Sequence, residues 1–386
     1  MKARQLFVAA VLLVTACSRP QNEKTIRIRN SLPFEREEVI SLDPERISTD
    51  TGAWRKLAIV IDDKTTPTQV VDLDGDGRID QLLAYVSVGP NEERVFKVKY
   101  SDEPAKTETP VFSRIVPERI DDYAWENDRV AFRTYGPEAQ RLAEAREPGG
   151  TMSSGIDCWL KRVDYPVIDK WYKKYTDGGS YHTDDGEGYD PYHVGLSRGC
   201  GGIGVWMVDS LYVSENFVSW RKIAEGPIRN TFELEYAPWM ANGITIRETK
   251  RISIDRGSQL ILIEELVDSA EPIPHITAGL TLHDAKGETF MDSANGVFGY
   301  WEKIDDAFLG TGLVTDPREV LSARDYRTSR TDQSHILVNI KPEGSRKFYA
   351  GFGWERAGRV TSREEWQTYL EQFSARLRSP LIVTVE

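Results

Sequence analysis

One irregular stretch of the chain, residues 170–206, holds the side chains best suited to move protons. It contains two of the five histidines, His182 and His193, together with Arg198. Its tyrosines are Tyr172, Tyr175, Tyr181, Tyr189 and Tyr192. Glycines interrupt the stretch, and no apolar periodicity of a strand or a helix runs through its middle. Because disordered segments are poor in aromatic residues, this composition predicts an ordered loop that lines a pocket.

These residue types suit a β-elimination on an acidic sugar. The C5–H of a uronic acid is acidic, and its loss as a proton accompanies the departure of a group from C4. His182 or His193 can act as the base, because the ordinary histidine pKa is about 6.5. Tyr181 or Tyr192 can protonate the leaving oxygen. Arg198 can hold the carboxylate in its planar fork while negative charge builds up there.

Other residues could contact the sugar itself. We expect Trp125 and Trp206 to stack on it, Glu126 to meet a hydroxyl group and Arg133 to assist Arg198 at the carboxylate. The alternative for each histidine is a structural residue held by hydrogen bonds. The tyrosines, for their part, could simply pack through their rings.

A second motif, Asp72-Leu73-Asp74-Gly75-Asp76-Gly77-Arg78-Ile79-Asp80, has the spacing of a calcium loop. Its carboxylates, at relative positions 1, 3, 5 and 9, come from Asp72, Asp74, Asp76 and Asp80, with glycine at position 6. Leu83 stands where an EF-hand places glutamate, and the flanking residues predict strands. We favour a structural calcium over a polar hairpin turn, and we expect no cofactor for catalysis.

The N-terminus predicts export and lipid attachment. Lys2 and Arg4 precede a short apolar run, and Val14-Thr15-Ala16-Cys17 resembles a lipobox. We expect residues 1–16 to be a signal peptide and residues 17–23 a lipidated tether at the outer membrane, facing the periplasm or the cell surface. No other run is long and apolar enough to span a bilayer, so membrane contact is expected only through the lipid. The alternative is a plain secretory signal.

The charge balance bears on possible partners. The formal net charge is −12, and removal of Lys2 and Arg4 makes it −14, which argues against nucleic acid as a partner. An anion could still bind at a local basic cluster. Cys158 and Cys200 are then the remaining cysteines, and either a disulfide or two buried thiols fits an exported protein. Nothing in the sequence indicates an oligomeric state.

The elements that must position these residues are mainly strands. Residues 24–101 read as short strands of an N-terminal β region, residues 102–114 as a linker and residues 115–386 as the larger, catalytic module. Long alternating segments in that module predict stacked antiparallel sheets with a few short helices. Ser362 and Glu365 have the spacing of a capping box, which predicts a helix with an apolar stripe beginning at Trp366.

Several blocks resemble a family first catalogued as a domain of unknown function, found in bacterial polysaccharide-utilisation clusters. They are YAWENDRVAFRTYGP, SGIDCW, YPVIDKWY, DDGEGYDPYHVGLSRGCGG and LYVSENF. The resemblance covers nearly the whole mature chain and implies a galactose-mutarotase-like β-supersandwich. We expect His275, His283 and His335 to be strand-face residues. Sites in such folds lie on a concave sheet face, which makes His275 the best reserve candidate of the three. The family includes an ulvan-oligosaccharide dehydratase that leaves a 4,5-unsaturated sugar.

The resulting hypothesis is a dehydratase that removes water from a terminal uronic acid of an oligosaccharide. The alternatives are a non-catalytic surface glycan-binding lipoprotein, a glycoside hydrolase using carboxylates such as Glu126 and Glu187, and a mutarotase-like enzyme.

Overall fold

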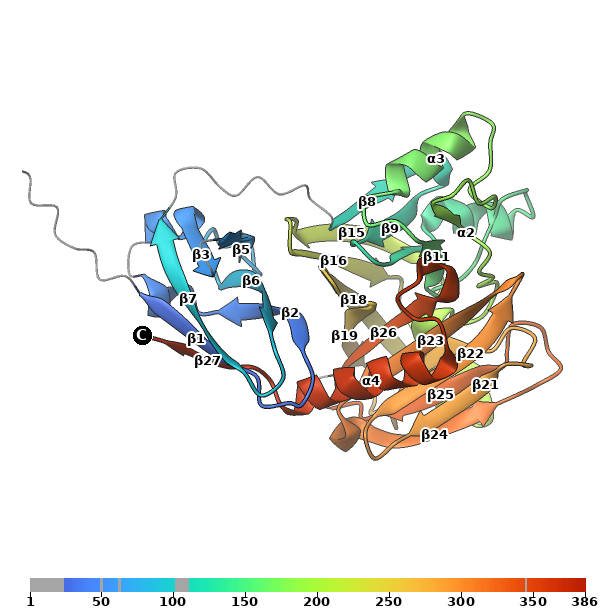
Figure 1. Cartoon of the computed structure of the whole chain (residues 1–386). Helices are drawn as coiled ribbons and strands as arrows, with labels where there is room; N and C mark the ends of the chain where they lie inside the picture. The colour runs from blue at the N-terminus through green and yellow to red at the C-terminus, as the bar shows by residue number, and fades with distance from the viewer. Residues whose placement is uncertain (1–23, 49–50, 62–63, 101–110, 344–345) are drawn as a thin grey trace, which may run out of the picture.

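The computed structural model describes residues 24–48, 51–61, 64–100, 111–343 and 346–386. Strands dominate it, and every pairing between its strands is antiparallel. The prediction of a mainly β fold of stacked antiparallel sheets, with a smaller N-terminal β region and a few short helices, is confirmed (Figure 1). Residues 1–23, for which we expected a signal peptide and a lipidated tether, lie outside the described residues.

The N-terminal region consists of two small sheets that face each other. One has the order β27 (Ile382–Val385), β1 (Thr25–Arg29), β7 (Glu93–Tyr100), β3 (Leu57–Ile61) and β4 (Lys64–Thr66). The other has the order β2 (Arg36–Leu42), β6 (Gln81–Val88) and β5 (Thr68–Val71). Ile26, Ile28, Leu82, Val86 and Phe96 pack between them because alternate residues of each strand point inward. Two short helical turns, α1 (Pro44–Ile47) and η1 (Thr51–Lys56), connect β2 to β3.

Two features correct the boundaries that we expected from the sequence. The last strand, β27, pairs with β1 of the N-terminal region and leaves the larger module, as Figure 1 shows. At the other end, β8 already begins at Phe112, inside the expected linker 102–114. The larger module therefore begins before residue 115 and ends before residue 386.

The larger module is a sandwich of two extensive sheets. A nine-stranded sheet has the order β15 (Phe217–Ala224), β16 (Arg229–Tyr236), β18 (Ile244–Asp255), β19 (Leu260–Ser269), β26 (Lys347–Trp354), β23 (Ala307–Thr315), β22 (Val297–Ile304) and β21 (Glu288–Asp292), and β17 (Trp239–Ala241) also pairs with β18. The second sheet has the order β14 (Ser210–Tyr212), β13 (Cys200–Met207), β20 (Ile276–Thr281), β25 (His335–Ile340) and β24 (Val320–Tyr326). Apolar side chains fill the space between them, among them Ile203, Ala278, Val338, Ile252 and Phe352.

In the sheet formed by β14, β13, β20, β25 and β24, the face turned away from the nine-stranded sheet is polar. Alternation along its strands turns Trp206, Thr277 and Asn339 away from the core between the two sheets. The Thr277 hydroxyl donates to the side-chain oxygen of Asn339 (2.9 Å), whose amide donates to the Ser322 hydroxyl (3.0 Å). A polar row thus crosses three neighbouring strands, which is the surface on which a hydrophilic ligand can lie.

A third sheet carries the loop that the sequence singled out. Its order is β12 (Gly188–Tyr189), β11 (Asp157–Lys161), β10 (Ala131–Thr134), β9 (Asp122–Glu126) and β8 (Phe112–Val116). Helix α3 (Ile168–Thr176) covers one face through Trp171 and Tyr172, and α2 (Pro137–Glu144) follows β10. The turn η2 (Pro117–Arg119) joins β8 to β9. The chain then runs through residues 177–199 with only the two-residue β12 as regular structure, as predicted for this stretch.

Helix α4 (Arg363–Arg378) begins as its capping box predicts. The Ser362 hydroxyl accepts from the N–H of Glu365 (3.2 Å), and the Glu365 carboxylate accepts from the N–H of Thr361 (2.7 Å). Trp366 and Leu370 are buried against β22 and β23. The short turns η3 (Pro317–Glu319) and η4 (Glu355–Ala357) complete the module. Among the described residues, no helix is long and apolar enough to cross a membrane.

Candidate functional site

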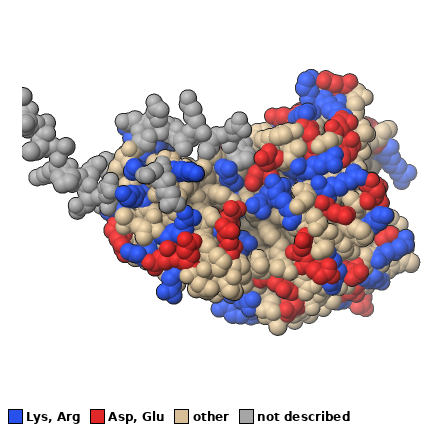
Figure 2. Space-filling view, in the orientation of Figure 1, with Lys and Arg blue, Asp and Glu red and all other residues tan. Residues whose placement is uncertain are grey.

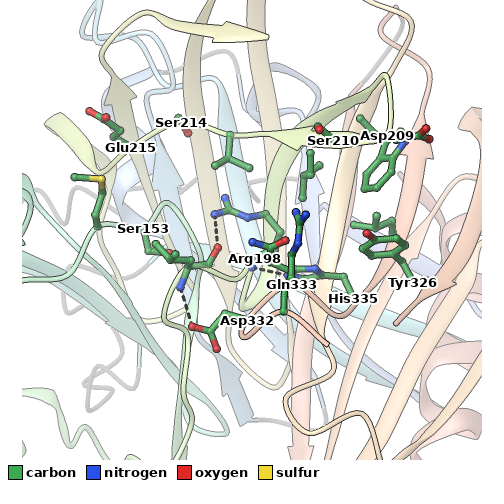
Figure 3. A pocket seen from close by; sticks show the side chains of 17 residues that line it. Ser153, Arg198, Asp209, Ser210, Ser214, Glu215, Tyr326, Asp332, Gln333 and His335 are labelled. Carbon is green, nitrogen blue, oxygen red and sulfur yellow. Dashed lines mark hydrogen bonds between the residues drawn. The ribbon is translucent and has the colours of Figure 1, made fainter. Parts of the chain in front are cut away.

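The candidate site is a cavity of about 480 Å³. It lies over the polar face of the sheet formed by β14, β13, β20, β25 and β24. Figure 3 shows its lining, which includes Ser153, Arg198, Tyr326 and Asp332. On the face drawn in Figure 2, positively and negatively charged side chains are mixed. That face has no broad field of one sign, so recognition of a charged ligand depends on local groups such as those in this cavity.

Arg198 is the unusual residue of this cavity. It lies just before β13 and is only 2% exposed. Its guanidinium donates to the Ser154 hydroxyl (2.8 Å) and to the Ile203 carbonyl (3.2 Å), and it forms no ion pair with any described residue. Gly279 makes room for it, since a Cβ there would come within 2.7 Å of the Arg198 Cβ. Burial lowers the pKa of Arg198 to about 10, and the charge of Glu248 offsets only part of the lost hydration.

His335 holds Arg198 in place. Its Nε2 accepts a hydrogen bond from the backbone N–H of Arg198 at 3.1 Å. Burial lowers the pKa of His335 to about 4, and the neutral ring keeps its proton on Nδ1, toward the Gln333 backbone. Both nitrogens are thus committed to the protein, so His335 has a positioning role.

His193 reaches the rim of the cavity through Asp332. Its Nε2 lies 3.2 Å from Asp332 Oδ1, and the same carboxylate accepts from the N–H of Leu196 (3.2 Å). The His193 ring is exposed, while its backbone carbonyl accepts from Nε2 of His283 (2.9 Å). A histidine oriented by a carboxylate at the edge of a cavity is an arrangement suited to proton transfer.

A second contact between a histidine and a carboxylate supports that arrangement. Nδ1 of His283 lies 2.6 Å from the Glu302 carboxylate. Burial lowers the pKa of His283, but the hydrogen bond to Glu302 and its charge outweigh burial, and the pKa is raised overall. Tyr192 packs edge-on against His283 at 4.6 Å between ring centroids. Tyr192 is itself buried, and burial raises the pKa of its hydroxyl well above the usual range.

An aromatic end closes the other side of the cavity. Trp206 and Tyr326 both line it, with ring centroids 5.1 Å apart. The Arg324 guanidinium lies 3.6 Å from the centroid of the Trp206 ring and covers one of its faces. His275 lies nearby, and burial, together with the charge of Arg324, lowers its pKa. Trp206 therefore stands where a sugar could meet it, with Arg324 behind it.

Arg133 belongs to a different, fully buried cluster under helix α3. Its guanidinium reaches Asp157 (2.7 Å), Asp190 (2.8 Å) and Asp122 (3.4 Å). The Tyr181 hydroxyl accepts from Arg133 at 2.9 Å. Burial alone would lower the pKa of Arg133, but the carboxylates outweigh it and raise the pKa well above its usual value. The cluster ties the long loop to the sheet beneath it.

His182 sits beside that cluster rather than in the cavity. Its Nδ1 lies 2.6 Å from the backbone carbonyl of Asp190, and its ring is more than half exposed. The structure thus divides the predicted catalytic residues between the cavity, the Arg133 cluster and the protein interior. Arg198 lines the cavity and His193 contacts Asp332 of its lining, whereas His182 and Tyr181 accompany Arg133, and Tyr192 is enclosed in the protein interior.

Two predicted sugar contacts are corrected by their burial. Trp125 is completely inaccessible and packs between Phe132 (5.7 Å) and Phe232 (5.1 Å) in the core. Glu126 is also inaccessible, paired with Lys161 at 2.7 Å. Its carboxylate accepts from the N–H groups of Val167 and Ile168, at the start of helix α3. A hydrolase pair that includes Glu126 is excluded for the same reason.

Several residues that line the cavity could not be recognised as site residues from the sequence. Asp332 lies 139 positions from His193, in a polar turn before β25. Tyr326 and Arg330 come from the same distant segment. Only the pairing of β25 with β20, and of β20 with β13, brings that segment beside the loop.

The two remaining sequence features are placed as follows. Asp72, Asp74 and Asp80 can each present one oxygen within 4.8 Å of the others, while Asp76 is not part of that group. The Asp72 carboxylate accepts from the N–H groups of Gly75 and Gly77, so it also shapes the turn. Cys158 and Cys200 are free, buried thiols, the second of the two alternatives for this pair.

The profile of one protein family, described as a domain of unknown function (DUF4861), matches residues 28–383. The chain belongs to the DUF4861 family. A relative of this DUF4861 protein, the uncharacterized protein P7 of Formosa agariphila, is 41% identical over 392 residues, covering 98% of each chain. The resemblance inferred from the sequence blocks is confirmed at the level of an uncharacterised family.

Solved structures similar to this DUF4861 protein come from Enterococcus faecalis. A protein in glycosyl hydrolase family 38 superimposes with a TM-score of 0.52 at 9% identity, covering 95% of this chain and 48% of the other. An alpha-mannosidase superimposes with a TM-score of 0.46 at 8% identity, covering 95% and 46%. The DUF4861 chain spans about half the length of these structures. The glycosyl hydrolase family 38 protein thus shares the β-rich fold over that part.

Proposed function

We propose that the protein is a carbohydrate-active β-eliminase, and specifically a dehydratase that removes water from a terminal uronic acid of an oligosaccharide. One observation carries the proposal: Arg198 is a buried cation that forms no ion pair with any described residue, and it lines a cavity large enough for a sugar. A buried charge is costly unless it is paired. A uronic carboxylate would complete the pair and would draw the ring onto the polar sheet face.

The reaction follows from the groups around that carboxylate. His193, oriented by Asp332, accepts the C5 proton, and the electrons of the broken C–H bond form the C4–C5 double bond. The C4–O bond breaks, and the departing hydroxyl group takes a proton to leave as water. Tyr326, which lines the cavity, is the available proton donor, in place of Tyr181 and Tyr192. Arg198 and the exposed Arg330 stabilise the charge that builds up on the carboxylate.

The test is incubation with a panel of oligosaccharides that end in a uronic acid, read by mass and by ultraviolet absorbance. A dehydratase gives a product lighter by one water that absorbs through its conjugated double bond. A product heavier by one water would identify a hydrolase, and an unchanged ligand that still binds would identify a glycan-binding protein. Either result would refute the proposal.

Variants on one loop make this test specific. His193→Ala should lower the rate of product formation by about 100-fold, within the usual range for a lost general base. His182→Ala is the matched control, because His182 lies on the same loop outside the cavity. Equal losses in both variants would count against His193 as the base.

A further inference from the structure

A second cavity, of about 250 Å³, lies where three parts of the chain meet. Strand β2 of the N-terminal region, the turn between β18 and β19, and helix α4 each contribute to its wall, and Figure 1 shows how α4 extends toward the N-terminal region. No residue that lines it also lines the cavity of the candidate site. It is therefore a separate place on the molecule.

The acidic residues of this junction cavity are already paired. The Asp255 carboxylate is held by Arg229 at 2.5 and 2.6 Å. Glu38 is held by Arg36 at 2.7 Å, and Glu37 accepts from Tyr85 (3.2 Å) and lies 3.6 Å from Arg129. Each carboxylate in the wall thus has its own donor.

Two arginines in the same wall have no such partner. Neither Arg256 nor Arg376 forms an ion pair or a side-chain hydrogen bond with a described residue. Arg256 lies against the ring of Tyr85 at 5.4 Å, and Arg376 lies 6.0 Å from the rings of Tyr369 and Phe373. Nε of Arg376 is buried without a hydrogen-bond partner. The wall therefore presents two guanidinium groups that have aromatic neighbours but no carboxylate partner among the described residues.

A third arginine, Arg36, lies in the same wall, although its charge is paired with Glu38. Arg36 is 1% exposed, and its guanidinium also donates to the Ser379 carbonyl at the end of α4 (2.7 Å). Burial lowers the pKa of Arg36, and the charge of Arg376 lowers it further against the opposing effect of Glu38. Arg36 and Arg376 thus repel each other across the cavity, and an anion between them would turn repulsion into attraction.

The rest of the wall is apolar. Leu260, Leu262, Phe373 and Leu377 line it beside the arginines. An oxyanion attached to a compact ring would satisfy both kinds of surface, since arginine pairs with carboxylate and sulfate oxygens through its fork and the apolar groups cover the ring. We propose that the junction cavity is a binding site for the carboxylate or sulfate group of an acidic saccharide, held by Arg256 and Arg376.

Binding there has a physical consequence beyond recognition. The ligand would bridge strand β2, the sheet and helix α4, and it binds the folded state only. Such a ligand raises the free energy of unfolding. Once its concentration exceeds the dissociation constant, this increase grows with the logarithm of the concentration. Occupancy can therefore be followed by thermal unfolding without measuring any catalytic activity.

The experiment compares sodium sulfate and sodium glucuronate with sodium chloride at equal ionic strength. Sulfate also stabilises proteins by exclusion from their surface, so the decisive quantity is the difference between wild type and a variant. Arg256→Gln combined with Arg376→Gln should weaken the saturable part of the response at least tenfold. Arg318→Gln, at an exposed arginine of another surface, is the control that should leave the response unchanged.

A parallel series in an Arg198→Met background separates the two cavities. If the junction cavity is the site, the response persists when Arg198 is lost, whatever the fate of the proposed dehydratase activity. Equal responses of wild type and the double variant, or a response to chloride as large as that to sulfate, would overturn the proposal. Binding of sulfate that a uronic disaccharide cannot displace would overturn its saccharide part.

Discussion

Arg133 and Arg198 are both buried, yet their surroundings are opposite. Arg133 has carboxylates from Asp122, Asp157 and Asp190 around it, and the pKa of its guanidinium is raised. Arg198 has only neutral hydroxyl and carbonyl acceptors, and its pKa is lowered to about 10. The first cluster has more carboxylates than cations. The second contains a cation that has no ion-pair partner among the described residues, which distinguishes a site from a structural cluster.

Replacing each arginine by methionine should separate these roles, and the largest effect is expected at Arg133. Arg133→Met leaves buried carboxylates without their cation and should lower the free energy of unfolding by about 3–5 kcal/mol. Urea unfolding followed by circular dichroism measures it. Arg198→Met removes an unpaired buried charge, so its unfolding free energy should stay the same or rise. The reverse order of stabilities would invalidate the comparison.

Activity should respond in the opposite way. Arg198→Met should reduce formation of the unsaturated product by about 100-fold, which is ~2.7 kcal/mol of transition-state stabilisation. Arg198→Lys keeps a charge but loses the planar fork and should recover only part of the rate. The rates come from the absorbance of the product under substrate saturation. An Arg198→Met variant as active as wild type would remove the main support for the proposed function.

The pH dependence of stability tests the Arg133 cluster through a smaller change in the free energy of unfolding. Burial raises the pKa of Asp122 to about 6, in a site shared with Arg133, Arg119 and Tyr172, whereas an unfolded aspartate has a pKa of about 3.9. The folded state binds this proton more tightly, so the stabilisation is present below pH 4 and is lost as the pH rises to 6. Relative to Asp122→Asn, wild type should lose on the order of 2 kcal/mol across that range. Parallel stability curves for the two proteins would contradict this reading.

The smallest effect is expected at the aspartate loop of the N-terminal region. If Asp72, Asp74 and Asp80 hold a calcium ion, a chelator should lower the melting temperature by a few degrees, equivalent to about 1 kcal/mol. Added calcium should restore it in wild type but not in Asp74→Asn. Asp76→Asn is the control, because Asp76 lies outside the group. If the chelator does not change the melting temperature, the loop holds no calcium and is a turn shaped by its own hydrogen bonds.

Local patterns in the sequence predicted the fold better than the site. The alternation in Thr25–Arg29 and Gln81–Val88 and the capping box at Ser362 act over a few residues, and the structure follows them. The cavity depends instead on contacts between distant strands, so Asp332 and Tyr326 could not be paired with His193 and Trp206 beforehand.

The burial of individual side chains was the second property that the sequence did not reveal. Trp125 and Glu126 have the composition of a sugar site, but α3 and the nine-stranded sheet enclose them. The spacing of residues along one strand does not reveal which face another element will cover. The irregular stretch was recognised as ordered, yet its histidines diverge because Asp190 anchors one part and Asp332 the other.

The pairing of β27 with β1 has a consequence for how the molecule is made. Strand β1 is synthesised long before its partner β27, so the sheet that contains both can close only after residues 382–385 have been made. A polypeptide that stops short of Ile382 would leave the edge of β1 open to pairing with a neighbouring molecule. Closure of this sheet therefore depends on a segment that lies far from β1 along the chain.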